Sequence, residues 1–137
     1  MGSLEEIYHF WNNSYDWSRY QGDEWSARWG GPAMQWHWSI LPRIRRHLPT
    51  STLLEIGPGH GRWSEYLQPH CDRLILLDIS ERCIHACKER LGEEGVTYKV
   101  GDGKTFTGVE DGSVDFCFSF ESLVQAEADV LSAYLRE

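Results

Sequence analysis

Residues 53–63 read Leu53-Leu54-Glu55-Ile56-Gly57-Pro58-Gly59-His60-Gly61-Arg62-Trp63, an apolar strand followed by a glycine-rich turn and the start of a helix. Glycines at alternate positions let the backbone turn sharply and approach a ligand, because a Cβ there would collide with the ligand or with a neighbouring strand. The spacing is G-x-G-x-G, whereas the dinucleotide fingerprint G-x-G-x-x-G requires glycine at position 62, where Arg62 stands. The turn therefore predicts a nucleotide-like ligand and disfavours a nicotinamide dehydrogenase.

Glu55 lies two places before the first glycine, and its charge restricts the class of ligand that the turn can hold. A carboxylate at the mouth of the turn repels a pyrophosphate and attracts an ammonium or a sulfonium. The stretch resembles motif I of the class I S-adenosylmethionine-dependent methyltransferases. This resemblance implies that Glu55, the turn Gly57-Pro58-Gly59 and Gly61 hold the aminocarboxypropyl arm of S-adenosyl-L-methionine and approach its ribose. The alternative is an ordinary strand-to-helix turn whose glycines serve packing.

Acidic residues also follow the next two predicted strands. Because ligands of open parallel sheets lie across the carboxyl ends of the strands, Glu55, Asp78 and Asp102 should converge on one crevice. Asp78, 23 places after Glu55, is spaced to accept hydrogen bonds from both ribose hydroxyls. Asp78 with Ile79 resembles the second motif of the same family, and Gly101-Asp102-Gly103 resembles the third, which meets the adenine. Helix capping by Asp78 and a simple turn at Asp102 are the alternatives.

The stretch Asp115 to Leu123 matches the fourth motif of the family in position. It lacks the Asn or Asp followed by Pro-Pro and Tyr or Phe of the amine methyltransferases. It resembles instead the branches that act on small molecules or on oxygen and carbon. The resemblance implies that Ser119 and Phe120 lie near the cofactor.

The sequence alone assigns no catalytic residue. A base is needed only where the acceptor must lose a proton, because methyl transfer is an in-line displacement. The candidate bases are, in falling order, His37, Glu121 and His9, each with packing or solvation as the alternative role.

The remainder of the chain predicts one α/β domain. We expect a Rossmann-like, mostly parallel sheet of about four strands in the order 3-2-1-4, with flanking helices, in residues 50–137. The expected strands are 52–56, 73–78, 96–100 and 114–120. The expected helices are 61–67, a helix opened by Ser80 and closed before Gly92, and 125–135. The buried side of the last helix should carry Ala126, Val130, Leu131, Tyr134 and Leu135.

Residues 1–49 predict an aromatic helical cap that is not an independent domain. Six of the chain's seven tryptophans precede residue 39. We expect a short helix over 4–11, an ordered loop over 12–31 and a helix from Pro32 to about His47, kinked or divided at Pro42. Its apolar side should carry Met34, Trp38, Leu41, Ile44 and Leu48. The cap tryptophans offer stacking surfaces for a ligand or simply cover the sheet.

Charge and cysteine content restrict the partners. The net charge of −8 argues against nucleic acid, and the basic cluster of Arg43, Arg45, Arg46 and His47 suits a helix C-terminus. No run is long enough to span a membrane, and the N-terminus has Glu5 and Glu6 where a signal peptide would be basic and then apolar. Four cysteines without a C-x-x-C pair predict reduced thiols, no metal site and a cytoplasmic protein.

These features predict the cofactor-binding half of an S-adenosylmethionine-dependent methyltransferase that acts on a small-molecule or saccharide-like acceptor. The alternative is a non-catalytic cofactor-binding or assembly module completed by another chain. Members of the resembled family usually have seven strands, so a domain of four would leave strand four at an open edge. The alternatives are a fragment of a longer enzyme, a chain completed by a partner, and a homo-oligomer that covers or swaps its edges. Of these we expect a truncated methyltransferase that self-associates.

Overall fold

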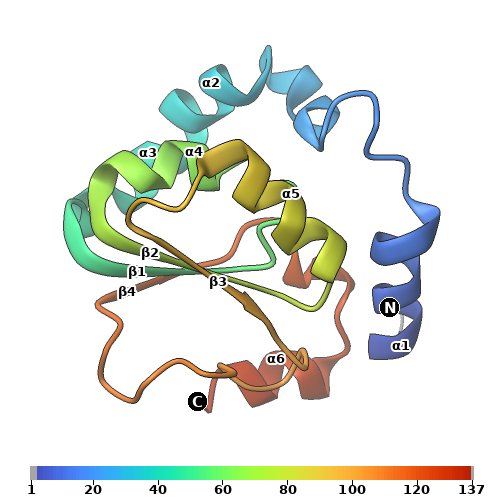
Figure 1. The fold of residues 1–137 in the computed structure, drawn as a ribbon. Coiled ribbons are helices and arrows are strands. Elements are labelled where there is room, and N and C mark those ends of the chain that lie inside the picture. Colours follow the sequence, from blue (N-terminus) through green and yellow to red (C-terminus); the bar gives the residue numbers. More distant parts are fainter. Residues whose placement is uncertain (1–2, 137) are drawn as a thin grey trace.

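The computed structural model describes residues 3–136 and contains a parallel four-stranded sheet in the order β3-β2-β1-β4, which confirms the predicted fold class and strand order (Figure 1). The strands are β1 (Thr50–Ile56), β2 (Cys71–Asp78), β3 (Val96–Val100) and β4 (Phe116–Phe118). Their apolar runs suit a sheet that is covered on both faces. Within the described residues β4 pairs with β1 alone, so its other edge has no strand partner there.

Helices cover both faces of this sheet. The helices α4 (Ser64–Leu67) and α5 (Glu81–Leu91) lie on one face, and α6 (Ala128–Tyr134) lies on the other (Figure 1). Each face has its own core. The core on the α4 and α5 side gathers Trp36, Ile40, Leu53, Trp63, Leu67, Leu74, Leu76, Ile84, Cys87 and Phe118. The core on the α6 side gathers Leu54, Ile56, Ile75, Leu77, Val130 and Tyr134.

The ends of α5 follow the predicted signals. The Ser80 hydroxyl accepts a hydrogen bond from the Cys83 amide at 3.2 Å, which satisfies a free N–H of the first turn. The helix ends at Gly92, whose φ of +75° is the left-handed conformation that glycine adopts at little cost. The prediction for this helix is therefore confirmed at both ends.

The fourth strand is shorter than predicted. The Asp115 carboxylate accepts a hydrogen bond from the Thr52 amide at 2.8 Å, so a side chain takes the place of a ladder carbonyl at that end. At the other end Ser119 and Ser122 donate to the Ile56 carbonyl, and the backbone turns away from β1. The prediction of a strand over 114–120 was too long at both ends.

The last predicted helix is divided into a 3₁₀ turn at Leu123–Gln125 and α6. Val130 and Tyr134 are buried, as predicted for its inner side, and Ala126 packs partly against the same core. The prediction was wrong for Leu131 and Leu135, which are 41% and 79% exposed. In a helix of two turns, one i, i+4 pair is enough to fill the side that faces the sheet, and here that pair is Val130 and Tyr134.

The N-terminal segment forms α1 (Leu4–His9), a π turn at Phe10–Ser14 and a 3₁₀ helix at Asp23–Trp29. The next stretch forms α2 (Pro32–Gln35), a π turn at Trp36–Ile40, α3 (Leu41–Ile44) and a 3₁₀ turn at Arg45–His47. As predicted, α2 begins at Pro32. The segment crosses from beside α1 to the side of the sheet that α4 covers (Figure 1).

The predicted apolar side of the helix around Pro42 was partly wrong. Met34 and Trp38 are 48% and 73% exposed, while Trp36 and Ile40 are buried. Pro42 has no N–H to donate within the helix, and the Leu41 amide instead donates to the Trp36 carbonyl. The buried positions Gln35, Trp36, Ser39 and Ile40 keep a helical period, so the predicted side was wrong at Met34 and Trp38. Leu41, Ile44 and Leu48 pack partly against the core, as predicted.

None of the helices described within residues 3–136 is long and apolar enough to cross a membrane. Among the same residues, no group of three or more His, Cys, Asp or Glu side chains is placed to hold a metal ion. All four cysteines have free thiols.

Candidate functional site

A cavity lies where the carboxyl ends of the strands meet the N-terminal segment. It contains about 920 Å³ of empty space, including the part open to solvent. Leu4 and Ile7 of α1 line it, and Figure 1 shows α1 standing beside this end of the sheet. Seven of the predicted site residues line it: Gly57, Pro58, Gly59, Asp78, Ile79, Gly103 and Phe120.

The glycine turn has little room for side chains. Gly57 has a φ of +68°, and a Cβ there would lie 2.5 Å from the Cβ of Ser122. Gly59 has a φ of +58°, and a Cβ there would lie 3.1 Å from the ring of Trp17. Gly61 is buried away from the cavity lining, where its Cβ would meet Cys87 Sγ at 3.4 Å. The first two glycines thus let the turn approach the cavity, and the third lets it pack on α5.

Asp78 connects the end of β2 to this turn. Its Oδ2 accepts a hydrogen bond from the Gly59 amide at 3.2 Å, and its Oδ1 accepts one from the Ser80 amide at 2.9 Å. Burial raises the pKa of Asp78 to about 6, although these backbone donors act in the opposite direction. The two amides fix a carboxylate at the cavity wall.

Glu55 lies behind the turn and does not line the cavity. It is only 2% exposed, and its Oε2 accepts a hydrogen bond from the Ser64 hydroxyl at 2.5 Å. Burial, together with the nearby Asp78 charge, raises its pKa to about 7, against the opposing effects of Ser64 and Arg62. Successive strand residues face opposite sides, so Glu55 shares the face of Leu53 and meets α4.

The third predicted motif is divided between two hollows. Gly103 lines the main cavity, whereas Gly101 and Asp102 line a neighbouring hollow with Val100 and Ile79. The exposed Asp102 carboxylate accepts hydrogen bonds from the Lys104 and Thr105 amides, both at 2.8 Å. These donors lower its pKa.

Ser119 does not line the cavity and has a supporting position instead. Its hydroxyl donates to the Ile56 carbonyl at 3.2 Å and lies 2.6 Å from the Ser122 hydroxyl. These contacts join the end of β4 to the end of β1. They place Phe120 and Glu121 in the cavity wall.

Sequence reasoning missed the role of Arg62, which is 5% exposed. Its Nη1 donates to the Ser26 hydroxyl and its Nη2 to Glu121 Oε2, both at 2.8 Å. The guanidinium carbon lies 4.4 Å from the ring centroid of Trp63 and 5.3 Å from that of Trp25. The available signal was an arginine at position 62, directly after the glycine turn, where the chain enters the core. A buried arginine needs a charged partner, so this position could have prompted a search for one.

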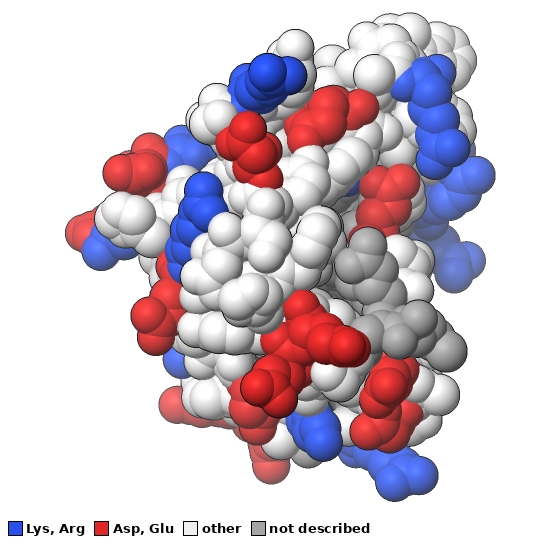
Figure 2. Space-filling model, turned by 90° about the vertical axis from the view of Figure 1, so that its right-hand side faces the viewer, with Lys and Arg blue, Asp and Glu red and all other residues white. Residues whose placement is uncertain are grey.

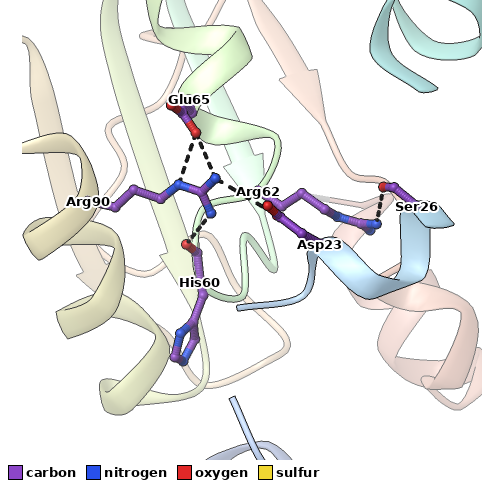
Figure 3. A network of polar contacts seen from close by, with 6 residues as sticks. All are labelled: Asp23, Ser26, His60, Arg62, Glu65 and Arg90. Atoms are coloured by element: carbon purple, nitrogen blue, oxygen red, sulfur yellow. Dashed lines mark hydrogen bonds and ion pairs between the residues drawn. The ribbon is translucent and has the colours of Figure 1, made fainter. Parts of the chain in front are cut away.

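A second arginine fixes the N-terminal segment from the other side. Arg90 donates to Glu65 through two nitrogens and to the His60 carbonyl, and it lies 3.9 Å from Asp23 (Figure 3). In the same view Arg62 reaches Ser26 on the 3₁₀ helix that carries Asp23. The segment is therefore attached to both the glycine turn and α5.

The buried Trp17 covers the turn. Its ring stacks on His60 with the centroids 4.0 Å apart and the planes 7° from parallel. Burial, with smaller effects of Arg82 and Arg90, lowers the pKa of His60 to about 4, so this imidazole is neutral near pH 7. Trp11, Tyr15 and Trp25 pack around Trp17 with centroids 4.7–5.6 Å from it.

The candidate bases separate clearly in position. His9 and His37 are exposed and do not line the cavity, whereas Glu121 does. Figure 2 shows the face beside α1, where acidic and basic side chains are interspersed over much of the view and basic side chains gather along its upper right edge.

Comparisons with known proteins match this chain to methyltransferases. The sequence profile described as "Methyltransferase domain" matches residues 54–137. An rRNA adenine N-6-methyltransferase of Streptomyces fradiae is 40% identical over 52 residues, which cover 38% of this chain and 16% of that protein. A methyltransferase of Claviceps purpurea is 29% identical over 79 residues, covering 58% of this chain and 25% of that protein. The matches thus span a quarter or less of these two relatives.

Two solved structures extend the comparison. An S-adenosylmethionine-dependent methyltransferase from Mesorhizobium loti is 25% identical, with a TM-score of 0.55 over 67% of this chain and 44% of that one. The DhpI-SAM-HEP complex has a TM-score of 0.66 over 97% of this chain and 56% of that one, at 22% identity. The second likeness concerns the fold, and it includes the N-terminal segment.

Proposed function

The chain belongs to the methyltransferase domain family, and from this membership we propose that it binds S-adenosyl-L-methionine in the cavity at the carboxyl ends of the strands. The observation that carries the proposal is the hydrogen bond from the Gly59 amide to Asp78, which joins the glycine turn to the end of β2. In open α/β sheets this is the position of nucleotide-like ligands.

The residues present fit this cofactor. Asp78 offers a fixed carboxylate for ribose hydroxyls, and Gly57 and Gly59 keep the turn free of side chains. His60 lines the cavity and its buried Nε2 has no hydrogen-bond partner among the described residues, which suits a polar ligand. The cofactor-binding set also includes Pro58, Ile79, Gly103 and Phe120. Glu55, Gly61 and Ser119 would act through the shape of the turn, and Gly101 and Asp102 through the neighbouring hollow.

When bound, the cofactor supplies an electrophilic methyl group on a sulfonium. The chain contributes alignment and the exclusion of water, because in-line displacement depends on the orientation of the two reacting groups. The apolar walls from Trp17, Trp63 and Phe120 serve that exclusion. The Asp78 carboxylate gives the cavity a negative group that favours a cationic methyl donor, whereas the charge of Glu121 is paired with Arg62.

The acceptor in this proposal is a small molecule or is saccharide-like rather than nucleic acid. The net charge of −8 disfavours a phosphate-rich acceptor, and acidic side chains are interspersed with basic ones over much of the face beside α1 (Figure 2). In this proposal the acceptor enters the cavity at the carboxyl ends of the strands and meets the methyl group there.

Calorimetric titration tests the cofactor proposal. Wild-type chain should bind S-adenosyl-L-methionine and S-adenosyl-L-homocysteine and should give no heat with NAD. Asp78→Asn should weaken binding by about 1–3 kcal/mol, roughly 5- to 150-fold, because a charged hydrogen-bond acceptor is lost. Asp111→Asn changes an exposed carboxylate outside the cavity lining and is the matched control. A folded sample that gives no heat with either adenosyl ligand would refute the proposal, and unchanged affinity in Asp78→Asn would refute the role of Asp78.

A further inference from the structure

The Arg62 guanidinium has partners on two of its three nitrogens. It is held between the rings of Trp25 and Trp63 and donates to Ser26 and Glu121. Its burial at 5% exposure makes this cation dependent on the Glu121 carboxylate. Arg62 therefore holds Glu121 in one place, and its charge is paired with that carboxylate.

Glu121 occupies an unusual position at the end of β4. Its φ is +61°, a left-handed conformation that costs a residue with a Cβ about 1–2 kcal/mol. Such conformations persist where the surroundings enforce them, and they concentrate at functional sites. The side chain lines the cavity and is 33% exposed, and Arg62 contacts only its Oε2. Oε1 has no hydrogen-bond partner among the described residues and can accept a proton donor from a ligand.

The other charged groups of the cavity exclude an anionic acceptor. Asp78 is a carboxylate, His60 is neutral near pH 7, and Arg62 is paired with Glu121. In the described cavity lining, a carboxylate or phosphate on the acceptor would find no unpaired arginine or lysine. A neutral or cationic acceptor meets no such penalty.

Trp63 distinguishes a neutral acceptor from a cationic one. It lines the cavity, it is 3% exposed, and its buried Nε1–H has no hydrogen-bond partner among the described residues. Arg62 contacts both Trp63 and Glu121, and both side chains line the cavity. A hydroxyl can donate to Glu121 and accept from Trp63, whereas an ammonium has donors only.

Aromatic rings complete the wall around these polar groups. Trp25 is 36% exposed, Trp11 and Phe120 are half-buried, and all three line the cavity. Phe120 packs edge-on against Trp63 at a centroid distance of 5.8 Å. A ring with apolar C–H surface and several hydroxyls matches both the rings and the polar pair.

We propose that Glu121, positioned by Arg62, is the acceptor-binding carboxylate of the cavity, and that it receives a hydroxyl of a neutral, saccharide-like ring. This inference rests on the proposed function. As the acceptor oxygen forms its bond to the methyl carbon, the carbon–sulfur bond breaks and its electron pair stays on sulfur. The hydroxyl proton passes to Glu121, and the products are the methyl ether and S-adenosyl-L-homocysteine.

Tryptophan fluorescence provides a test that needs no turnover. The 137-residue chain, saturated with S-adenosyl-L-homocysteine, is titrated with the methyl glycosides of glucose, mannose and galactose. Methyl glucuronide serves as the anionic probe and methyl glucosaminide as the cationic one. At least one neutral glycoside should bind saturably, and at least tenfold more tightly than either charged probe.

Variants then test the carboxylate itself. Glu121→Gln should weaken the glycoside at least tenfold and leave the affinity for S-adenosyl-L-homocysteine unchanged. Glu121→Asp retains a charge for Arg62 but shortens the arm, so it should show the same loss if the Gln variant fails to fold. Arg62→Lys keeps the charge but loses the planar fork that reaches Ser26 and Glu121 from separate nitrogens, so it should also lose glycoside affinity selectively. Glu110→Gln, an exposed change outside the cavity lining, is the control.

The possible failures are distinct. Wild-type chain that does not bind S-adenosyl-L-homocysteine would overturn the proposed function, and this inference with it. Cofactor-product binding without saturable binding of any neutral glycoside would overturn the inference alone. The same holds if the glucuronide or the glucosaminide binds as tightly as the glycosides, or if folded Glu121 variants retain wild-type glycoside affinity.

Discussion

Replacing Glu55 by glutamine should change how the stability of the chain depends on pH. Burial raises the pKa of Glu55 from 4.5 to about 7, so the folded chain keeps a proton that the unfolded chain loses above pH 4.5. Folding stability from this group is therefore complete below about pH 4.5 and is lost as pH rises to about 7. The loss amounts to about 3 kcal/mol at pH 8.

Glutamine removes this loss because an amide does not titrate. It has nearly the same shape as glutamic acid, and its carbonyl can accept the Ser64 hydrogen bond that Glu55 now accepts. The free energy of unfolding of Glu55→Gln minus that of wild type should rise by about 3 kcal/mol between pH 4 and pH 8. Asp78 is present in both chains, so its own titration contributes to both curves.

Urea denaturation followed by tryptophan fluorescence at half-unit pH steps measures this difference. Glu110→Gln, at an exposed carboxylate, should give a flat difference over the same range. A difference for Glu55→Gln that is also flat, or that falls as pH rises, would show that Glu55 is ionised in the folded chain near neutral pH. The account of its burial would then be wrong.

Two further predictions concern the turn and the thiols. Gly57→Ala should lower the free energy of unfolding by about 1–3 kcal/mol, since alanine would need a φ of +68° and would lie 2.5 Å from Ser122 Cβ; urea denaturation showing less than about 0.5 kcal/mol would contradict this. Burial raises the pKa of Cys83 to about 12 and also raises that of Cys87. Iodoacetamide at pH 8 should therefore label both more slowly than the exposed Cys117, as mass spectrometry of digested samples would show, and equal rates would indicate that α5 opens readily.

The sheet could be predicted because its signals are local. Short apolar runs bounded by turns mark the strands, and Ser80 and Gly92 mark the ends of α5 through the backbone groups that they satisfy or the conformation that they permit. The placement of Asp78 at the cavity follows from the same logic, since it ends a strand of a parallel sheet.

Other features depend on contacts that no local pattern contains. The pairing of Arg62 with Glu121 joins residues 59 positions apart and forms only because β4 lies beside β1. The burial of Trp36 in place of Trp38 depends on which side of this segment meets the sheet, where Trp36 joins Leu53 and Leu67 in one core. Strand alternation alone, however, would have placed Glu55 on the face of Leu53, under α4 and behind the cavity wall.

Position 62 connects the class of ligand to the structure of the acceptor site. A glycine there would suit a dinucleotide turn, in which a helix N-terminus approaches a pyrophosphate. Arg62 instead places a buried cation over the rings of Trp25 and Trp63, where it requires an anionic partner. Since β1 and β4 are neighbours, the turn after β1 lies beside the turn after β4, and Glu121 supplies that anion. The substitution that removes the dinucleotide pattern thereby fixes a carboxylate, with one oxygen unpaired among the described contacts, in the wall of the cavity.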